Sequence, residues 1–306
     1  SEQGVSRAQV WKDVEALRAR GYTIAASPGG GYRLVETPDR LYPEELHAGL
    51  DTRWLARDIR YFDEIDSTNR VALDLARGGA AHGVTVVAEA QTAGRGRLGR
   101  SFFSPAYENL YTSVVLRPSI AIGEAPVWTL AAAVAVADTV AESAGSDADV
   151  EIKWPNDVLL GGLKTSGILM ELGAEATRVS HLVLGIGVNL NTERAQLPGE
   201  FRHLATSLAS HRGRRVDRIA FARRLFENLE HSLDACAESG LDGILPRFQA
   251  RFRMPGRSVR VRELDGSEIA GTVRGIDADG ALIVAPPGAD AVRVVAGDVT
   301  IDKGEP

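Results

Sequence analysis

The sequence predicts an α+β protein whose largest part is a central mixed sheet with helices, and three observations support this fold class. The front of the chain reads as one helix followed by two short strands. The middle alternates strand-like and helix-like segments, as expected for helices packed on a sheet. The last part carries short alternating strands separated by turns. We therefore expect a partial domain at 1–37, a linker at 38–59, a main domain at 60–253 and a small β domain at 254–306.

Composition is typical of an ordinary globular protein. The chain has 306 residues, 44% apolar and 25% charged, which is enough for more than one domain. Its net charge of −6 gives no broad nucleic-acid surface, so any DNA contact must come from a local patch. We expect no membrane segment, no secretory leader and a cytoplasmic location. The one cysteine, Cys236, lies on the apolar stripe of a helix, which favours a core role over a nucleophilic one.

The first element is expected to be a helix over residues 6–21. Ser6 followed three residues later by Gln9 forms a capping box. Two short strands follow, around 22–24 and 32–34, with a glycine-rich turn between them. The sequence therefore predicts a helix and a hairpin in succession.

This helix and hairpin resemble the recognition helix and wing of a winged helix-turn-helix. In that interpretation Arg7, Gln9 and Lys12 are the DNA-binding residues. The alternative is a helical cap on a hairpin, because a complete module needs a further helix before Ser6. We expect either a truncated sequence or a decayed module.

The main domain is expected to alternate strands and helices. Strands are predicted at 60–65, 83–90, 110–116, 151–154 and 181–191, and helices at 66–78 and 128–144. The alanine-rich helix 128–144 has apolar residues on most faces, so we expect it to be buried against the sheet.

The junction between the first of these strands and the first helix has two interpretations. Ser67, Thr68 and Asn69 offer hydroxyl and amide groups that suit a small polar ligand. The same residue types are also good helix N-caps. Spacing alone does not separate the two.

Residues 91–100 form the most distinctive stretch. Gly94 to Arg100 holds three arginines and three glycines, so the segment is cationic and too flexible to keep one shape without a ligand. Its glycines fit a dinucleotide-binding pattern, but no helix opens on Gly99, and we set that interpretation aside. A solvated turn does not explain so many arginines in an acidic chain. We favour a loop that folds over a phosphate-bearing ligand, and we call the segment from Gly94 to Arg100 the arginine loop.

Lysine is scarce, with only four among 35 basic residues. Two of them, Lys153 and Lys164, lie within twelve residues of each other. A compact ammonium suits a reaction that needs a point charge at one oxygen. The segment around Lys164 lacks the glycines of a Walker motif, which excludes a P-loop. Gly185 and Gly187, in the last central strand, are expected to let a ligand approach the backbone.

Taken in chain order, five segments resemble the biotin protein ligase family. They are Asp66–Asn69, Gln91–Arg100, Lys153–Asp157, Lys164–Leu169 and Gly185–Asn189. The resemblance covers most of residues 60–250. It implies a class II synthetase-like main domain, a winged helix before it and a small Src-homology-3-like β-barrel after it.

The resemblance also implies an activity and a role for individual residues. The expected enzyme activates biotin with ATP to biotinyl-5′-AMP, with Mg²⁺, and then transfers biotin to a lysine of a carrier protein. Lys164 and Arg97 are the expected catalytic residues. The expected biotin site is Ser67, Thr68, Asn69, Gln91, Arg95, Gly96, Arg97 and Lys164. The expected nucleotide site is Gly94, Arg95, Arg97, Arg100, Lys153, Asn156, Asp157 and Asn189, and no metal ligand is assigned.

The implied partners are the biotin carboxyl carrier protein of acetyl-CoA carboxylase and, for a complete winged helix, operator DNA. A homodimer is one possible assembly. Two alternatives stay open. One is a lipoate-type ligase or acyltransferase of the same fold, which the dense arginine loop disfavours. The other is a non-catalytic, biotin-sensing repressor, which the intact Lys164 disfavours.

Overall fold

The computed structural model describes residues 6–27, 29–263 and 265–302, so Pro28 of the predicted turn lies outside the described residues. The chain divides into two compact units, Ser1–Arg40 and Leu41–Pro306. The division falls inside the segment predicted as a linker.

The first unit contains helix α1 (Arg7–Ala19) and the antiparallel strands β1 (Thr23–Ser27) and β2 (Gly31–Glu36). Ser6 caps α1, because its side-chain oxygen accepts a hydrogen bond from the Gln9 backbone N–H at 3.2 Å. The Gln9 side chain does not complete the predicted capping box. It donates instead to Asp13, one turn further on, at 2.8 Å.

The first unit buries little of its apolar surface. Of the apolar residues Val10, Val14 and Leu17, which share one face of α1, only Val14 is buried, and Val10 is exposed. Trp11 on the helix and Leu34 and Val35 on the hairpin are also more than one-third exposed. One helix over a two-stranded hairpin offers few surfaces against which these side chains can pack.

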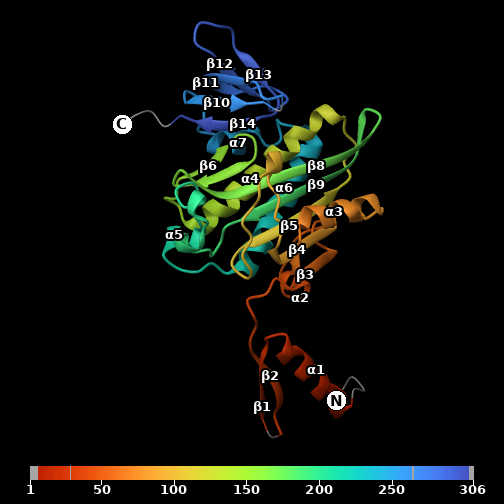
Figure 1. Ribbon diagram of the computed structural model, residues 1–306. Helices are drawn as coiled ribbons and strands as arrows, with labels where there is room; N and C mark the ends of the chain where they lie inside the picture. The colour runs from red at the N-terminus through yellow and green to blue at the C-terminus, as the bar shows by residue number, and fades with distance from the viewer. Residues whose placement is uncertain (1–5, 28, 264, 303–306) are drawn as a thin grey trace. The chain divides into compact units, whose positions relative to one another are not determined.

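The second unit is built on a seven-stranded mixed sheet in the order β3-β4-β5-β9-β8-β7-β6 (Figure 1). Strands β3 and β4 are parallel, and every other neighbouring pair is antiparallel. The strands are β3 (Ile59–Ile65), β4 (Thr85–Gln91), β5 (Leu110–Leu116), β6 (Val150–Lys153), β7 (Asp157–Leu160), β8 (Leu163–Glu175) and β9 (Arg178–Val188). The predicted central mixed sheet is confirmed.

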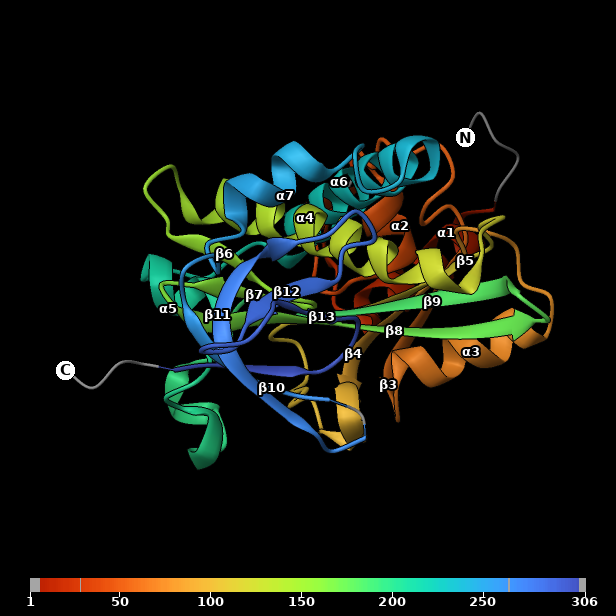
Figure 2. The same cartoon turned by 90° about the horizontal axis from the view of Figure 1, so that it is seen from above.

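Helices cover both faces of this sheet. Helix α3 (Thr68–Arg77) packs on one face, and α4 (Ala125–Ala144) and α6 (Arg218–Ser239) lie on the other (Figure 2). The shorter helices are α2 (Pro43–His47), α5 (Leu208–Arg212) and α7 (Leu245–Arg251). Cys236 of α6 is buried, and burial raises the pKa of its thiol to about 12, which agrees with the core interpretation.

Helix α4 is more apolar than the sequence interpretation allowed. The segment Ile122–Ala144 is long and apolar enough to cross a membrane by length and composition. However, 72% of its most apolar window is buried inside the fold. Its apolar faces contact the sheet and α6, which accounts for the composition without a bilayer.

The segment predicted as a linker joins the second unit from Leu41 onward. Leu41, Leu46 and Leu55 are fully buried in the main core. The Leu41 N–H donates to the carboxylate of Glu89 on β4 at 2.8 Å. Glu89 also forms a 2.7 Å ion pair with Arg218 of α6, and both side chains are inaccessible to solvent. This segment is therefore part of the fold and not a free connection.

The C-terminal part of the second unit is a five-stranded antiparallel sheet in the order β13-β12-β11-β10-β14. Its strands are β10 (Ser258–Arg262), β11 (Glu268–Ile276), β12 (Leu282–Ala285), β13 (Val292–Val294) and β14 (Asp298–Ile301). Buried Trp154 attaches this sheet to the main domain, because its indole N–H donates to the Gly280 carbonyl at 2.8 Å. Trp154 is thus a structural anchor.

Candidate functional site

A cavity opens where the end of β3, the end of β4 and the adjoining parts of β8 and β9 meet. The empty space between its lining atoms is about 460 Å³, a figure that includes open solvent at the mouth. All eight residues of the expected biotin site line the cavity, together with one residue that was expected at the nucleotide site alone. These are Ser67, Thr68, Asn69, Gln91, Arg95, Gly96, Arg97, Lys164 and Asn156.

The parallel pairing of β3 and β4 brings Ser67 and Thr68 close to the arginine loop. Ile65 and Gln91 are register partners at the carboxyl ends of the two strands, so the segments that follow them leave the sheet side by side. One segment starts α3 with Ser67 and Thr68, and the other is the arginine loop. The junction that the sequence allowed as either a ligand site or a helix N-cap lies at the cavity.

Thr68, Asn69 and Gln91 line a neutral part of the cavity, and Ser113, which does not line it, contacts Thr68 and Asn69. We call these four residues the polar cradle. The side-chain oxygen of Gln91, Oε1, accepts from the Thr68 backbone N–H at 2.8 Å and from the Thr68 hydroxyl at 3.1 Å. Ser113 Oγ lies 2.8 Å from Thr68 Oγ1 and 2.6 Å from Asn69 Oδ1. Ser67 occupies the N-cap position of α3 but makes no side-chain capping bond. This arrangement favours the receptor interpretation.

Two glycines of β9 make room for this cradle. A Cβ on Gly185 would lie 1.8 Å from Asn69 Oδ1, and one on Gly187 would lie 2.6 Å from the Phe102 ring. From the sequence we expected these glycines to let a ligand approach the backbone. In the structure the protein's own Asn69 and Phe102 side chains occupy it.

Backbone hydrogen bonds join the two arms of the arginine loop. The Gly96 N–H donates to the Arg100 carbonyl at 2.7 Å, and the Phe102 N–H donates to the Gly94 carbonyl at 2.8 Å. Between them a single 3₁₀ turn covers Arg97–Gly99. These internal hydrogen bonds close the loop into a narrow hairpin over the cavity.

Arg97 and Lys164 form the cationic end of the cavity. The Arg97 guanidinium donates to Asn156 Oδ1 at 3.1 Å, and burial lowers its pKa, although the charges of Asp157 and Asp298 partly oppose this. Lys164 Nζ lies 2.6 Å from Asp157 Oδ1. The Lys164 side chain lies over Gly167, where a Cβ would come within 3.1 Å of Nζ.

Further cations continue this end toward the C-terminal sheet. Arg100 forms a two-point ion pair with Asp298 at the start of β14. Lys153 is partly buried, and burial lowers the pKa of its ammonium despite the nearby carboxylates of Asp157 and Asp298. Lys153, Arg100, Asp157, Gly94 and Asn189 do not line the cavity, whereas they were predicted for the nucleotide site.

Asn189 belongs to the framework that supports the cavity. It is buried, and its amide donates to the Thr206 carbonyl at 3.1 Å. Thr206 in turn donates its N–H to the Lys164 carbonyl at 2.9 Å. The segment after β9 therefore holds the backbone of Lys164 in place.

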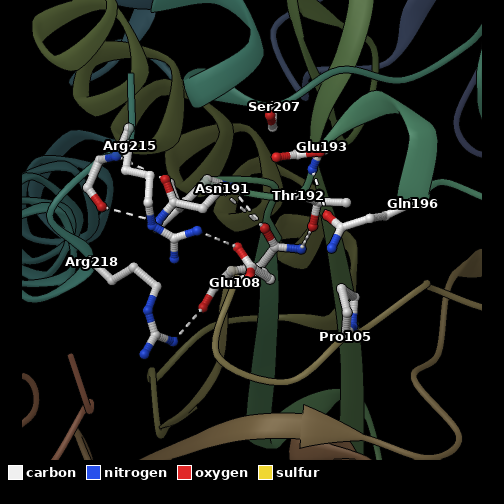
Figure 3. A network of polar contacts seen from close by, with 12 residues as sticks. Pro105, Glu108, Asn191, Thr192, Glu193, Gln196, Ser207, Arg215 and Arg218 are labelled. Atoms are coloured by element: carbon white, nitrogen blue, oxygen red, sulfur yellow. Dashed lines mark hydrogen bonds and ion pairs between the residues drawn. The ribbon is translucent and has the colours of Figure 1, made fainter. Parts of the chain in front are cut away.

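The two ends of that segment are joined to each other, and Figure 3 shows Asn191, Arg215 and Glu108 at this junction. Asn191 exchanges two hydrogen bonds with the Val216 backbone, at 3.0 and 2.7 Å. Arg215 forms a 3.0 Å ion pair with Glu108 beside them. These contacts join residues near β5, β9 and α6 into one support.

Sequence reasoning missed three residues that touch the predicted ones. Ser113 completes the cradle, Phe102 lines the cavity, and Glu171 pairs with both Asn69 and Arg95. Phe102 lies two residues after Arg100, and this closeness to the arginine loop in the sequence is a signal for it. Ser113 and Glu171 lie inside strands, where only the pairing register brings them to the site.

No group of three or more His, Cys, Asp or Glu side chains within residues 6–27, 29–263 and 265–302 could hold a metal ion. The described part of the chain therefore offers no metal cage built from protein alone. A metal at this site would need ligand atoms from a substrate.

Three family models match the chain in order. They are the HTH domain at residues 1–33, the Biotin/lipoate A/B protein ligase family at 61–189 and the Biotin protein ligase C terminal domain at 256–301. The bifunctional ligase/repressor BirA of Bacillus subtilis is 38% identical over 281 residues, which cover 92% of this chain and 86% of that protein. This chain belongs to the biotin protein ligase family.

Other members of the biotin protein ligase family agree in sequence and fold. A biotin--[acetyl-CoA-carboxylase] ligase of Mycobacterium tuberculosis is 36% identical, over 82% of this chain and 91% of that protein. The structure of an Aquifex aeolicus biotin protein ligase in complex with biotin and ATP superposes with a TM-score of 0.68 and 25% identity. It covers 80% of this chain and 99% of the Aquifex chain.

Proposed function

We propose that this protein is a biotin protein ligase that works in two steps. Biotin's carboxylate attacks the α-phosphorus of ATP, which gives biotinyl-5′-AMP and releases pyrophosphate. A lysine amine of a biotin carboxyl carrier protein then attacks the biotinyl carbonyl, forms an amide and releases AMP. The observation that carries this proposal is one cavity with a neutral polar cradle at one end and Lys164 with Arg97 at the other.

The cradle suits the head group of biotin. A ureido ring presents two N–H donors and one carbonyl acceptor, and Ser67, Thr68, Asn69 and Gln91 offer hydroxyl and amide groups in the same cavity. The dithiolane ring of lipoate offers no such donors. The cradle therefore favours biotin over the lipoate-type alternative that the family description includes.

The cationic end suits the first chemical step. Biotin's carboxylate and the α-phosphate of ATP are both anions, so their approach is repelled. A unit charge about 4 Å away contributes about 4 kcal/mol at an effective dielectric constant near 20. Lys164 would bridge the carboxylate and the α-phosphate, and Arg97 would stabilise the charge that develops between them.

The arginine loop would also protect the intermediate. A mixed anhydride is hydrolysed when water reaches it, and Arg95, Gly96 and Arg97 of the loop line the cavity in which it would form. Lys153, Arg100 and Asp157 would face the phosphates from beyond the cavity. Mg²⁺ fits best as an ion carried by ATP, with Asp157 as a protein oxygen ligand.

Exchange of labelled pyrophosphate into ATP tests this proposal. The first step is reversible, so the wild-type protein should catalyse exchange only when biotin is added. Exchange with lipoate and not with biotin would move the substrate to the lipoate class. If neither biotin nor lipoate supports exchange, the proposed ligase function is wrong.

We also propose a second role as a biotin-responsive transcriptional repressor. The match of residues 1–33 to an HTH domain and the similarity to a bifunctional ligase/repressor support it. Arg7, Gln9 and Lys12 are exposed on α1, as DNA-binding residues must be. A homodimer on two half-sites in the cytoplasm would be the binding form. Fluorescence anisotropy with DNA from the promoter of a biotin synthesis operon, with and without biotin and ATP, tests this role.

A further inference from the structure

Glu171 connects two parts of the site and does not itself line the cavity. It lies on β8, and its side chain is 22% exposed. Its Oε2 accepts from the Asn69 amide at 2.9 Å and from Arg95 at 3.3 Å. Its Oε1 lies 3.1 Å from the other terminal nitrogen of Arg95. One carboxylate thus holds a cradle side chain and a loop arginine.

The first contact fixes the orientation of the Asn69 amide. Its two N–H groups donate to Glu171 and to the Leu169 carbonyl, so its oxygen faces Ser113. The second contact fixes the loop. Arg95 comes from the arginine loop, and its guanidinium reaches across to β8, with the cavity between the loop and the sheet.

We propose that the Glu171–Arg95 ion pair is a latch that slows the escape of bound biotin and of biotinyl-5′-AMP. This inference rests on the proposed ligase function. The latch acts on the lifetime of the complex and not on the chemical step, because Glu171 contacts the two cavity-lining side chains and not the cavity. Glu171 is therefore a positioning residue.

Dissociation rates measure this latch. Glu171→Gln removes the charge but keeps an oxygen that accepts from Asn69, so it isolates the contact with Arg95. We expect it to raise the dissociation rates of labelled biotin and of a non-hydrolysable biotinyl-adenylate analogue about two- to fivefold, the range of a partly exposed ion pair. The kcat of pyrophosphate exchange at saturating substrates should change less than about twofold. Glu175→Gln, an exposed glutamate on the same strand, is the matched control and should change neither.

A double-mutant cycle separates a latch from a general structural effect. Arg95→Ala should also speed dissociation, and Glu171→Gln should add nothing in the Arg95→Ala background. Additive effects, or unchanged dissociation in Glu171→Gln, would overturn the latch while biotin binding by the wild type upholds the ligase. A wild-type protein that does not bind biotin would overturn the proposed function and the latch together.

Discussion

The two ends of the cavity are held in different ways. The cradle is neutral and mostly buried, and its side chains are joined by hydrogen bonds to one another. The cationic end is held by ion pairs with carboxylates, Lys164 with Asp157 and Arg100 with Asp298, whose basic members are at least one-third exposed. The cradle is a preformed surface, whereas the cations are paired with groups that an anionic ligand can replace.

This difference predicts that one end of the cavity serves ligand recognition and the other serves the reaction. A rigid, neutral end loses little freedom when a ligand binds, so it contributes mainly to affinity. Cations whose carboxylate partners can be replaced by an anionic ligand interact most strongly when two anions are brought together. They therefore contribute mainly to stabilising the transition state. Substitutions at the two ends should therefore change different kinetic constants.

Lys164→Ala should give the largest effect. Loss of this ammonium should reduce kcat for biotin-dependent pyrophosphate exchange roughly 10²- to 10³-fold, as for removal of one stabilising donor at a reacting centre. The affinity for biotin should change much less, because the cradle is intact. Single-turnover adenylation and equilibrium biotin binding measure the two effects.

Lys12→Ala, in the first unit, is the control and should exchange pyrophosphate like the wild type. A Lys164→Ala variant that is folded by circular dichroism and turns over normally would remove Lys164 from the chemistry. The comparison between the two ends would then fail.

Ser113→Ala should give a smaller effect, and it should change the affinity for biotin and not kcat. It removes the hydroxyl between Thr68 and Asn69 and leaves buried acceptors with one partner fewer. We expect biotin affinity to fall about tenfold, or about 1.4 kcal/mol, with kcat little changed. Ser146→Ala, in an exposed turn, is the control. A fall in kcat with unchanged affinity would show that the cradle also serves the reaction.

The predicted residues that do line the cavity lie mostly next to a change of element. Ser67, Thr68 and Gln91 lie at strand ends, and Arg97 lies in a loop with unusual composition. Ser113 and Glu171 lie in strand interiors, and they reach the site only because β9 lies between β5 and β8. That order and its register depend on packing across the whole sheet, which local patterns do not contain.

The segment predicted as a linker shows the same limit. Pro38 and Pro43 indicate an interruption, and the division into units does fall between them. The burial of Leu41 depends on Glu89 and Arg218, which lie 48 and 177 residues further along the chain. A contact over such separations leaves no local signal.

Arg100→Gln should give the smallest effect and tests whether the cations act singly or together. The Arg100 side chain is 64% exposed and paired with Asp298, so solvent and that carboxylate reduce its influence on a bound phosphate. We expect the KM for ATP to rise about two- to fivefold with kcat nearly unchanged. Asp298→Asn is the complementary variant, because it frees Arg100 for the phosphates and should leave the KM for ATP equal or lower. An effect of Arg100→Gln as large as that of Lys164→Ala would mean that the cationic end acts as a collective field, and the assignment of the first step to one ammonium would be wrong.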